Sequence, residues 1–254
     1  MPTTVGVLAL QGGFREHLSL LSKASHMLLA SSGSARTDYS FIEVRTSAEL
    51  ARCDALIIPG GESTTMSLVA AQTDLLDRLR DFVKVQKKPV WGTCAGLILL
   101  SDAANATKKG GQELIGGLPV RVHRNHFGRQ TESFEADMTL PFLQGPPTTT
   151  ASEEEDGKNG AGADAGTESD RPFRCVFIRA PVVEEVLDTQ TVQVLAKLPG
   201  RLDRAVPGVS QARTKDGSGD IVAVRCGNVL GTSFHPELTD DARIHSWWLR
   251  TLVA

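Results

Sequence analysis

Residues Pro89-Val90-Trp91-Gly92-Thr93-Cys94-Ala95-Gly96-Leu97-Ile98-Leu99-Leu100 join two apolar runs through a short stretch of small residues. This pattern predicts a strand, a tight turn and a helix, with Cys94 at the apex of the turn, as in a nucleophile elbow. At the start of a helix, free N–H groups and the helix dipole stabilise a thiolate. We therefore predict that Cys94 is a nucleophile, although a free cysteine is more often a buried structural residue.

A second motif, Phe234-His235-Pro236-Glu237, follows the apolar stretch Val229–Ser233 near the other end of the chain. In extended backbone, residues two apart point to the same side, so Glu237 can orient the imidazole of His235 and stabilise its charge. With Cys94, these residues supply the nucleophile, base and orienting carboxylate of acyl transfer. We therefore predict a catalytic triad. The alternative for Glu237 is an ordinary surface carboxylate.

The motifs along the chain resemble those of a known family. Cys94 in GTCAG, with His235 and Glu237 in HPE, is similar to the triad of class I glutamine amidotransferases. Further stretches resemble the glutaminase subunits of pyridoxal 5′-phosphate synthases, and the likeness covers nearly the whole chain apart from insertions. These stretches are LALQGGFREH (8–17), PGGESTTM (59–66), RNHFGRQ (124–130) and FIRAP (177–181).

The resemblance implies hydrolysis of the glutamine side-chain amide through a glutamyl thioester on Cys94. The backbone N–H groups of Gly61 and Ala95 would form the oxyanion hole. Opposite charges are needed for the α-amino and α-carboxylate groups of the substrate, and arginine suits a carboxylate because its planar fork donates two bonds. The residues assigned to glutamine binding in this way are Gly60, Gly61, Glu62, Arg124, Ile178 and Arg179. His126 stands where the family more often has a smaller polar residue.

The resemblance also implies a partner. A separate synthase subunit would build pyridoxal 5′-phosphate from a pentose phosphate and a triose phosphate, and ammonia would reach it through a closed interface. The glutaminase would depend on that subunit, which would order the Gly60-Gly61 peptide. Gln11 and the neighbourhood of His17 are candidate contact points. No cofactor is implied.

Alternating apolar segments predict the fold. Four strand-like runs alternate with helix-like segments in the first half, and the second half is richer in strands before a closing helix at 241–252. This order predicts a three-layer, doubly wound, mostly parallel α/β sheet of the flavodoxin-like type found in class I glutamine amidotransferases, with an antiparallel extension. The expected strands are 4–10, 41–44, 55–58, 89–91, 118–122, 132–136, 174–178, 192–195, 221–224 and 229–232, and the earlier helices are 14–29 and 63–83.

Ligands of such sheets bind outside the carboxyl ends of the strands. Gln11, Gly60, Gly61 and Cys94 all follow expected strands. We therefore expect them to meet at one edge of the sheet.

Two segments differ from the rest of the chain. The stretch 144–172 is rich in acidic and small residues and cannot bury enough apolar area to order its backbone, so we predict a disordered acidic insertion. A second excursion is expected at 199–219. Neither is typical of a domain boundary, so 1–254 is predicted to be a single glutamine amidotransferase domain.

Composition excludes several other functions. The 254 residues carry a net charge of −3, which gives no electrostatic case for binding nucleic acid or an anionic membrane. There is no apolar run long enough to span a bilayer and no signal-peptide pattern at Met1, so a cytoplasmic enzyme is expected. Neither the four cysteines nor the histidines outside the HPE motif show metal-ligand spacing, and no metal site is predicted. Those histidines, including His17 and His245, are expected to be surface or satisfied core residues.

Two alternatives stay open. The chain can be a stand-alone cysteine hydrolase of the same fold that cleaves peptide or γ-glutamyl bonds. It can also be a catalytically silent regulatory subunit, against which the presence of Cys94, His235 and Glu237 together argues.

Overall fold

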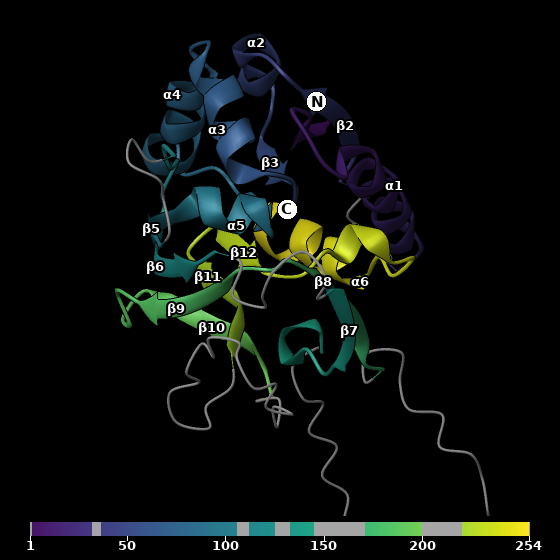
Figure 1. Ribbon diagram of the computed structural model, residues 1–254. Coiled ribbons are helices and arrows are strands. Elements are labelled where there is room, and N and C mark those ends of the chain that lie inside the picture. Colours follow the sequence, from purple (N-terminus) through teal and green to yellow (C-terminus); the bar gives the residue numbers. More distant parts are fainter. Residues whose placement is uncertain are drawn as a thin grey trace, which may run out of the picture.

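Strand β4 (Val90–Thr93), Cys94 and helix α5 (Ala95–Leu100) form the centre of the fold (Figure 1). The computed structural model describes residues 2–31, 37–105, 112–124, 133–144, 171–199 and 220–253. Every residue of β4 and α5 is buried. The strand–turn–helix predicted around Cys94 is therefore confirmed, and it lies where both layers of helices meet the sheet.

The main sheet has the strand order β2-β1-β3-β4-β12-β11-β9-β6-β5, with β10 paired to β11. Neighbours from β2 to β12 are parallel, whereas β11 is antiparallel to β12, β9 and β10, and β9 is antiparallel to β6. The mostly parallel sheet with an antiparallel extension is thus confirmed. The strands are β1 (Thr3–Leu8), β2 (Tyr39–Val44), β3 (Ala55–Ile58), β5 (Ser101–Ala104), β6 (Leu118–His123), β9 (Val182–Val186), β10 (Val192–Leu198), β11 (Asp220–Cys226) and β12 (Val229–Thr232).

Helices cover both faces of this sheet. On one face, α1 (Phe14–Ser31) packs against α6 (Arg243–Trp248) and the π-helical turn η4 (Leu249–Val253), as Figure 1 shows. On the other face, α3 (Ser63–Ala71) packs against α4 (Leu75–Arg80) and α5, and α2 (Ser47–Ala51) packs against α4. Each face has its own apolar core, one around Leu56 and Leu97 and the other around Trp91 and Trp248. The molecule therefore has the three layers that the sequence predicts, and Trp248 packs as expected.

Two expected strands do not join the main sheet. β7 (Ser133–Met138) and β8 (Phe173–Ile178) pair with each other in a separate antiparallel sheet, visible below α6 in Figure 1. Alternate residues of β8 are buried, and Phe173 and Phe177 pack against Phe234. This hairpin therefore covers the segment that carries His235 and does not extend the main sheet, which corrects the prediction for 132–136 and 174–178.

The helix expected over 63–83 is interrupted. Thr73 Oγ1 donates to Ala70 O and accepts from Leu75 N, so its side chain replaces helical hydrogen bonds at this point. The chain resumes as α4 and ends in the π-helical turn η1 (Asp81–Val85). The closing helix likewise begins at Arg243, whose N–H is capped by Asp241, and it ends in η4. Strands β5 and β9 and helix α2 were not predicted.

Several predictions fall outside the described residues. Most of the acidic insertion at 144–172 and of the excursion at 199–219 lies there, as does His126. Among the described residues, no helix is long and apolar enough to cross a membrane.

Candidate active site

The carboxyl ends of the parallel strands bring the predicted residues together. Gln11 follows β1, Gly60 and Gly61 follow β3, and Cys94 follows β4. Gln11 Oε1 accepts a hydrogen bond of 2.9 Å from the backbone N–H of Glu62, next to Gly61. These contacts confirm that the loops after β1 and β3 meet at one edge, as expected for ligand sites in such sheets.

Cys94 occupies a strained turn. Its φ of 48° and ψ of −101° are unfavourable for a residue with a side chain, and its N–H donates to Thr232 O on β12 at 2.8 Å. The turn closes because Gly96 has no side chain: a Cβ there would lie 2.0 Å from the carbonyl oxygen of Ile58. Strand and helix thus approach closely enough to hold the thiol at the tip, which is the geometry of a nucleophile elbow.

His235 and Glu237 form the pair predicted from their spacing. Nδ1 of His235 donates to Glu237 Oε1 at 2.7 Å, which leaves Nε2 for the thiol of Cys94. The segment is anchored by a hydrogen bond of 2.8 Å from His235 N to Val176 O on β8. The β7–β8 hairpin therefore helps to place the histidine.

The electrostatics of the pair favour an imidazolium beside a carboxylate. Burial disfavours the charged ring of His235, but its hydrogen bonds with Cys94 and Glu237 outweigh burial and raise the pKa of His235 to about 10. Burial also opposes the charge on Glu237, yet His17 and His235 hold the pKa of this carboxyl well below its usual range. A buried carboxylate with a low pKa is a permanent acceptor, so Glu237 keeps the Nδ1–H tautomer of His235.

Gly60 lies against the histidine ring. A Cβ at Gly60 would lie 2.3 Å from Cε1 and 2.8 Å from Nδ1 of His235. Its carbonyl oxygen in turn packs against Gly12, where a Cβ would lie 1.7 Å from that oxygen. The Gly60-Gly61 peptide is therefore held between the first loop and the histidine.

Replacing Gly60 with alanine is expected to lower kcat by about 10²-fold, because the new methyl group displaces the ring from Glu237 and small displacements of reacting groups have effects of this size. The free energy of unfolding should fall by about 1–3 kcal/mol. Steady-state kinetics and thermal melts measure the two effects. Gly227→Asn is the control, since Gly227 has a φ of 54°, which asparagine tolerates, and open space around it. A wild-type kcat in Gly60→Ala would contradict the close approach of Gly60 to the ring of His235.

Two of the three charged residues predicted to bind glutamine, Glu62 and Arg124, contact each other. Nη2 of Arg124 lies 3.4 Å from Glu62 Oε1 and donates to Thr64 Oγ1 at 3.2 Å. Glu62 also caps α3, since its carboxylate accepts from the N–H groups of Thr64 and Thr65. Burial opposes the charge of Glu62, but these hydrogen bonds outweigh it and lower the pKa of the carboxyl.

Ile178 and Arg179 lie at the end of β8. Ile178 is partly exposed, and Arg179 is exposed with a φ of 45°. The described contacts do not connect either side chain with Cys94 or Glu62. Their part in glutamine binding, like that of the Ala95 N–H in the oxyanion hole, stays a prediction.

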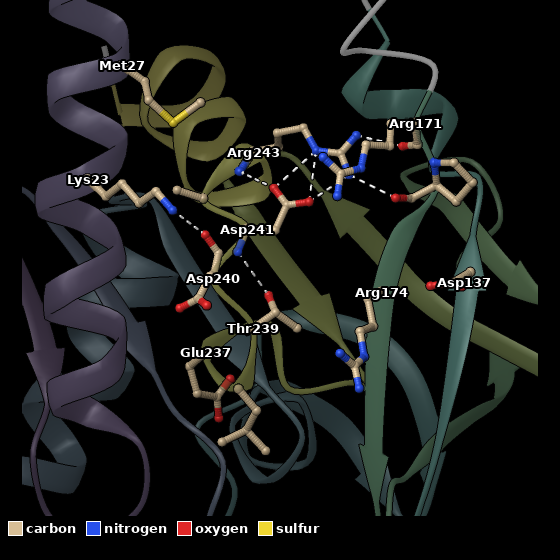
Figure 2. Close-up of a pocket in the computed structure, with 13 residues that line it drawn as sticks. Lys23, Met27, Asp137, Arg171, Arg174, Glu237, Thr239, Asp240, Asp241 and Arg243 are labelled. Carbon is tan, nitrogen blue, oxygen red and sulfur yellow. Dashed lines mark hydrogen bonds and ion pairs between the residues drawn. The ribbon is translucent and has the colours of Figure 1, made fainter. Parts of the chain in front are cut away.

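A cavity of about 1040 Å³ lies behind Glu237, between α1, the segment 237–243 and the β7–β8 hairpin (Figure 2). Two of its cations are held by neighbouring groups: Lys23 donates to the backbone carbonyl of Asp240, and Arg243 binds Asp241 and the carbonyl oxygens of Arg171 and Pro172. Neither Cys94 nor His235 lines this cavity. It is therefore not the place where glutamine would meet the thiol.

The two histidines that lie behind the carboxylate of Glu237 were not predicted from the sequence as part of the site. His17 of α1 is fully buried, with Nε2 3.3 Å from Glu237 Oε2 and Nδ1 2.9 Å from His245 Nε2. Both are core residues, one of the two places predicted for them, but Nδ1 of His245 has no hydrogen-bond partner among the described residues. The side chain of His17 is buried, so only the residues around it could meet a partner, and the neighbourhood of His17 stays a predicted contact point. No local pattern links two histidines from opposite ends of the chain.

The remaining cysteines have the structural character that was predicted. Cys53 and Cys175 are fully buried, and burial raises the pKa of both, to about 11 for Cys53. Cys226 is partly buried, and all four cysteines are free thiols. Within the described ranges, no group of three or more metal-ligating side chains comes together.

The fold and these side chains define a class: an α/β protein in which a cysteine at a nucleophile elbow meets a histidine–glutamate pair. The chain belongs to the SNO glutamine amidotransferase family, which matches residues 7–151 and 165–254. It is also similar to a solved crystal structure of a glutamine amidotransferase, with a TM-score of 0.67 and 34% identity over 98% of this chain and 99% of that one.

Relatives of the chain carry consistent names. The probable pyridoxal 5′-phosphate synthase subunit PDX2 of Arabidopsis thaliana is 44% identical, over 97% of this chain and 85% of the relative. The pyridoxal 5′-phosphate synthase subunit SNO1 of Saccharomyces cerevisiae is 40% identical, over 98% and 93%. The subunit PdxT of a Nocardioides species is 39% identical, over 95% and 92%. The family resemblance seen in the sequence is thus confirmed along nearly the full length.

Proposed function

We propose that this chain is the glutaminase subunit of a pyridoxal 5′-phosphate synthase. It hydrolyses L-glutamine to L-glutamate and ammonia, and the ammonia passes to a separate synthase subunit in a hetero-oligomer. The observation that carries the proposal is the meeting of Cys94, His235 and Glu237 at the sheet edge of a glutamine amidotransferase fold. The names of the relatives support the choice of acceptor pathway.

The chemistry follows from the triad. The thiolate of Cys94 attacks the amide carbon of glutamine, and the imidazolium of His235 gives its proton to the leaving ammonia. Water then attacks the glutamyl thioester while the neutral ring of His235 takes a proton from it. The C–S bond breaks, the thiolate leaves, and the ring keeps that proton, which restores the thiolate–imidazolium pair, while the new carboxyl group of glutamate loses its proton to solvent. Glu237 holds the ring and offsets its charge in each step.

Charge develops on the amide oxygen in both steps. The backbone N–H groups of Gly61 and Ala95 are the proposed donors to this oxygen. Ala95 begins α5, so its N–H is free of helical partners, and Gly61 follows the peptide that packs on His235. The same peptide therefore connects the oxyanion hole with the triad.

Glutamine binding is proposed to use Glu62 for the α-amino group and Arg124 and Arg179 for the α-carboxylate, with Gly60, Gly61 and Ile178 beside the side chain. Without substrate, Arg124 contacts Glu62. The ammonium and carboxylate of glutamine can replace this weak contact with two opposite-charge pairs.

Glu62→Gln is expected to raise KM for glutamine by about 10–100-fold with a smaller change in kcat, because the proposed charge pair with the α-amino group of the substrate is lost. The glutamine side chain at position 62 keeps a carbonyl oxygen that can accept a hydrogen bond at the start of α3. The melting temperature of this variant should therefore change little. Steady-state kinetics in the presence of the synthase subunit measure both constants. Glu49→Gln, in the cap of α2, is a matched control away from the site. An unchanged KM in Glu62→Gln would exclude its binding role.

Dependence on the partner is part of the proposal. Cys94 is only 6% exposed, so little of the thiol is accessible at the surface. The Gly60-Gly61 peptide, which also contacts Gln11 through the next residue, is the segment proposed to change when the synthase subunit docks. Activity of the isolated chain would then be low.

Ammonia release from L-glutamine by the purified chain, with and without a pyridoxal 5′-phosphate synthase subunit, tests the proposal. Strong stimulation by the synthase, absent in Cys94→Ala, is the expected result. Full activity of the chain alone would favour a stand-alone cysteine hydrolase. No Cys94-dependent activity in either condition would favour a catalytically silent subunit.

The proposal treats the chain as one catalytic domain with the acidic stretch 144–172 inserted in it. A cytoplasmic location is also proposed, since all four cysteines are free thiols, as expected in a reducing compartment.

A further inference from the structure

Glu237 contacts a buried histidine, His17, on the side away from His235, and this contact links the proposed triad with the protein core. Oε1 of Glu237 accepts from His235, and Oε2 lies 3.3 Å from Nε2 of His17. No well-aligned hydrogen bond to Oε2 is present in the part of the chain that the structure describes, so its contact with His17 is an ion-pair distance. Glu237 is 5% exposed and His17 is 0% exposed, so the contact between them is buried. The second oxygen of the carboxylate therefore faces Nε2 of His17.

Nε2 of His17 must carry a proton. An ionised carboxylate can only accept, and the pKa of Glu237 is held well below its usual range. Nε2 also lies 3.4 Å from Thr93 Oγ1, so a single N–H serves two oxygens, one of them on the residue before Cys94. Catalytic hydrogen bonds are often long before substrate binds and shorten afterwards.

His245 sets the other nitrogen of His17. Nε2 of His245 lies 2.9 Å from Nδ1 of His17, and His245 is completely buried. Burial lowers the pKa of His245 well below its usual value, so this ring is neutral. Nδ1 of His245 has no partner among the described residues, which fits a bare nitrogen there and a proton on Nε2. His245 then donates to His17, and His17 donates to Glu237.

The rings are fixed by packing. The edge of Trp91 on β4 contacts both imidazoles, with ring centroids 5.7 Å from His17 and 4.8 Å from His245. Nε1 of Trp91 donates to Thr232 Oγ1 on β12. Since β4 leads to Cys94 and β12 leads to His235, the strands that carry the triad also hold the histidines behind it.

We propose that His17 is a positioning residue for glutamine hydrolysis: its Nε2–H holds the second oxygen of Glu237, and His245 holds His17. The inference rests on the proposed triad. Without His17, the carboxylate can rotate away from His235 and accept a proton more readily, so both the orientation and the charge of Glu237 would change. Figure 2 shows Glu237 beside α1, the helix that carries His17.

Other charged groups also surround Glu237. Glu16 on α1 and Glu237 both approach Gly13, where a Cβ would lie 3.5 Å from Glu16 Oε2 and 3.3 Å from Glu237 Oε1. Lys23 and Asp240 lie across the cavity of Figure 2. These groups are unchanged in the variants below, so a shift in the pH profile reports on His17 itself.

The test compares two substitutions of His17 in the complex with the synthase subunit. Glutamine places its amide nitrogen near the position of Nε2, whereas asparagine reaches only the position of Nδ1. We expect His17→Asn to lower kcat about 10–100-fold while KM stays within about 2-fold of the wild type. A loss of about 10–100-fold is typical when a group that orients a metal-ligating side chain is removed. We expect His17→Gln to stay within about 3-fold of the wild type. His26→Asn, an exposed histidine on the same helix, is the control.

The pH profile separates positioning from general damage. In His17→Asn the acid limb of kcat should move to higher pH, because Glu237 loses a donor that favours its charged form. Wild-type kcat and an unmoved limb in His17→Asn, or equal losses in His17→Gln and His17→Asn, would overturn the proposal. If Cys94→Ala retains activity, the proposed triad is wrong. That conclusion does not depend on the results for the two His17 variants.

A measurement on the unaltered protein covers the case in which neither variant folds. Nitrogen-15 NMR of the histidine rings, with the ring of His17 assigned through the backbone resonances of α1, should give a protonated Nε2 and a bare Nδ1. A bare Nε2 would overturn the proposal, because His17 then has no proton to donate to Glu237.

Discussion

Cys94→Ala is expected to lower the rate of glutamine hydrolysis in the presence of the synthase subunit by at least about 10⁴-fold. The thioester cannot form without the thiol, and removal of a nucleophile from a triad has effects of this order. The substitution removes one small buried group at the start of α5, so the melting temperature should stay within a few degrees of the wild type. Ammonia release and thermal melts measure the two quantities.

Cys226→Ala is the matched control. Cys226 is a free thiol at the end of β11, and it is more exposed than Cys53 or Cys175. It should keep wild-type activity. Iodoacetamide should inactivate the wild type and Cys226→Ala alike through alkylation of Cys94. More than about 1% residual activity in Cys94→Ala would show that another group attacks glutamine.

The elbow around Cys94 was predictable because all of its determinants are local. A strand, a turn of small residues and a helix follow one another within Pro89–Leu100, and the need for Gly96 arises from packing against the adjacent strand β3. The order of apolar segments likewise predicts the parallel half of the sheet, since each strand lies beside others reached by short helical connections.

The deviations arise from tertiary contacts that periodicity does not carry. β8 alternates buried and exposed residues like any half-covered strand, so its pattern cannot say which sheet it joins. Its packing on Phe234 decides that it covers the histidine segment. The break at Thr73 depends on a side chain that competes with the helix backbone, and helix-compatible apolar spacing continues across it.

The candidate site divides in the same way. His235 and Glu237 are two residues apart, so extended backbone predicts their pairing, and the structure gives the hydrogen bond. His17 and His245 lie 228 positions apart and meet only because α1 packs against α6. No sequence pattern indicates that meeting, and each histidine alone is typical of a satisfied core residue.

Glu237→Gln is expected to lower kcat by about 10²–10⁴-fold with little change in KM. The carboxylate accepts from His235 on one side and faces the Nε2 of His17 on the other. A carboxamide has one accepting oxygen and one donating nitrogen, so one of the two histidines faces a donor in place of an acceptor. The ring of His235 then no longer keeps its Nδ1–H tautomer or its orientation. The same mismatch should lower the free energy of unfolding at pH 7 by about 2 kcal/mol. Kinetics with the synthase subunit and thermal melts measure these changes.

The pH dependence of the stability difference identifies the charge as the cause. The folded pKa of Glu237 lies well below the unfolded value near 4.5, so its contribution is present above about pH 5 and is lost as the pH falls toward the folded pKa. The wild type and Glu237→Gln should therefore differ most near pH 7 and converge in acid. Glu185→Gln, which breaks the exposed pair with Arg121, should keep full activity. A difference for Glu237→Gln that is constant from pH 7 to pH 3 would mean that shape and not charge makes this residue important, and the catalytic role of the carboxylate would fail with it.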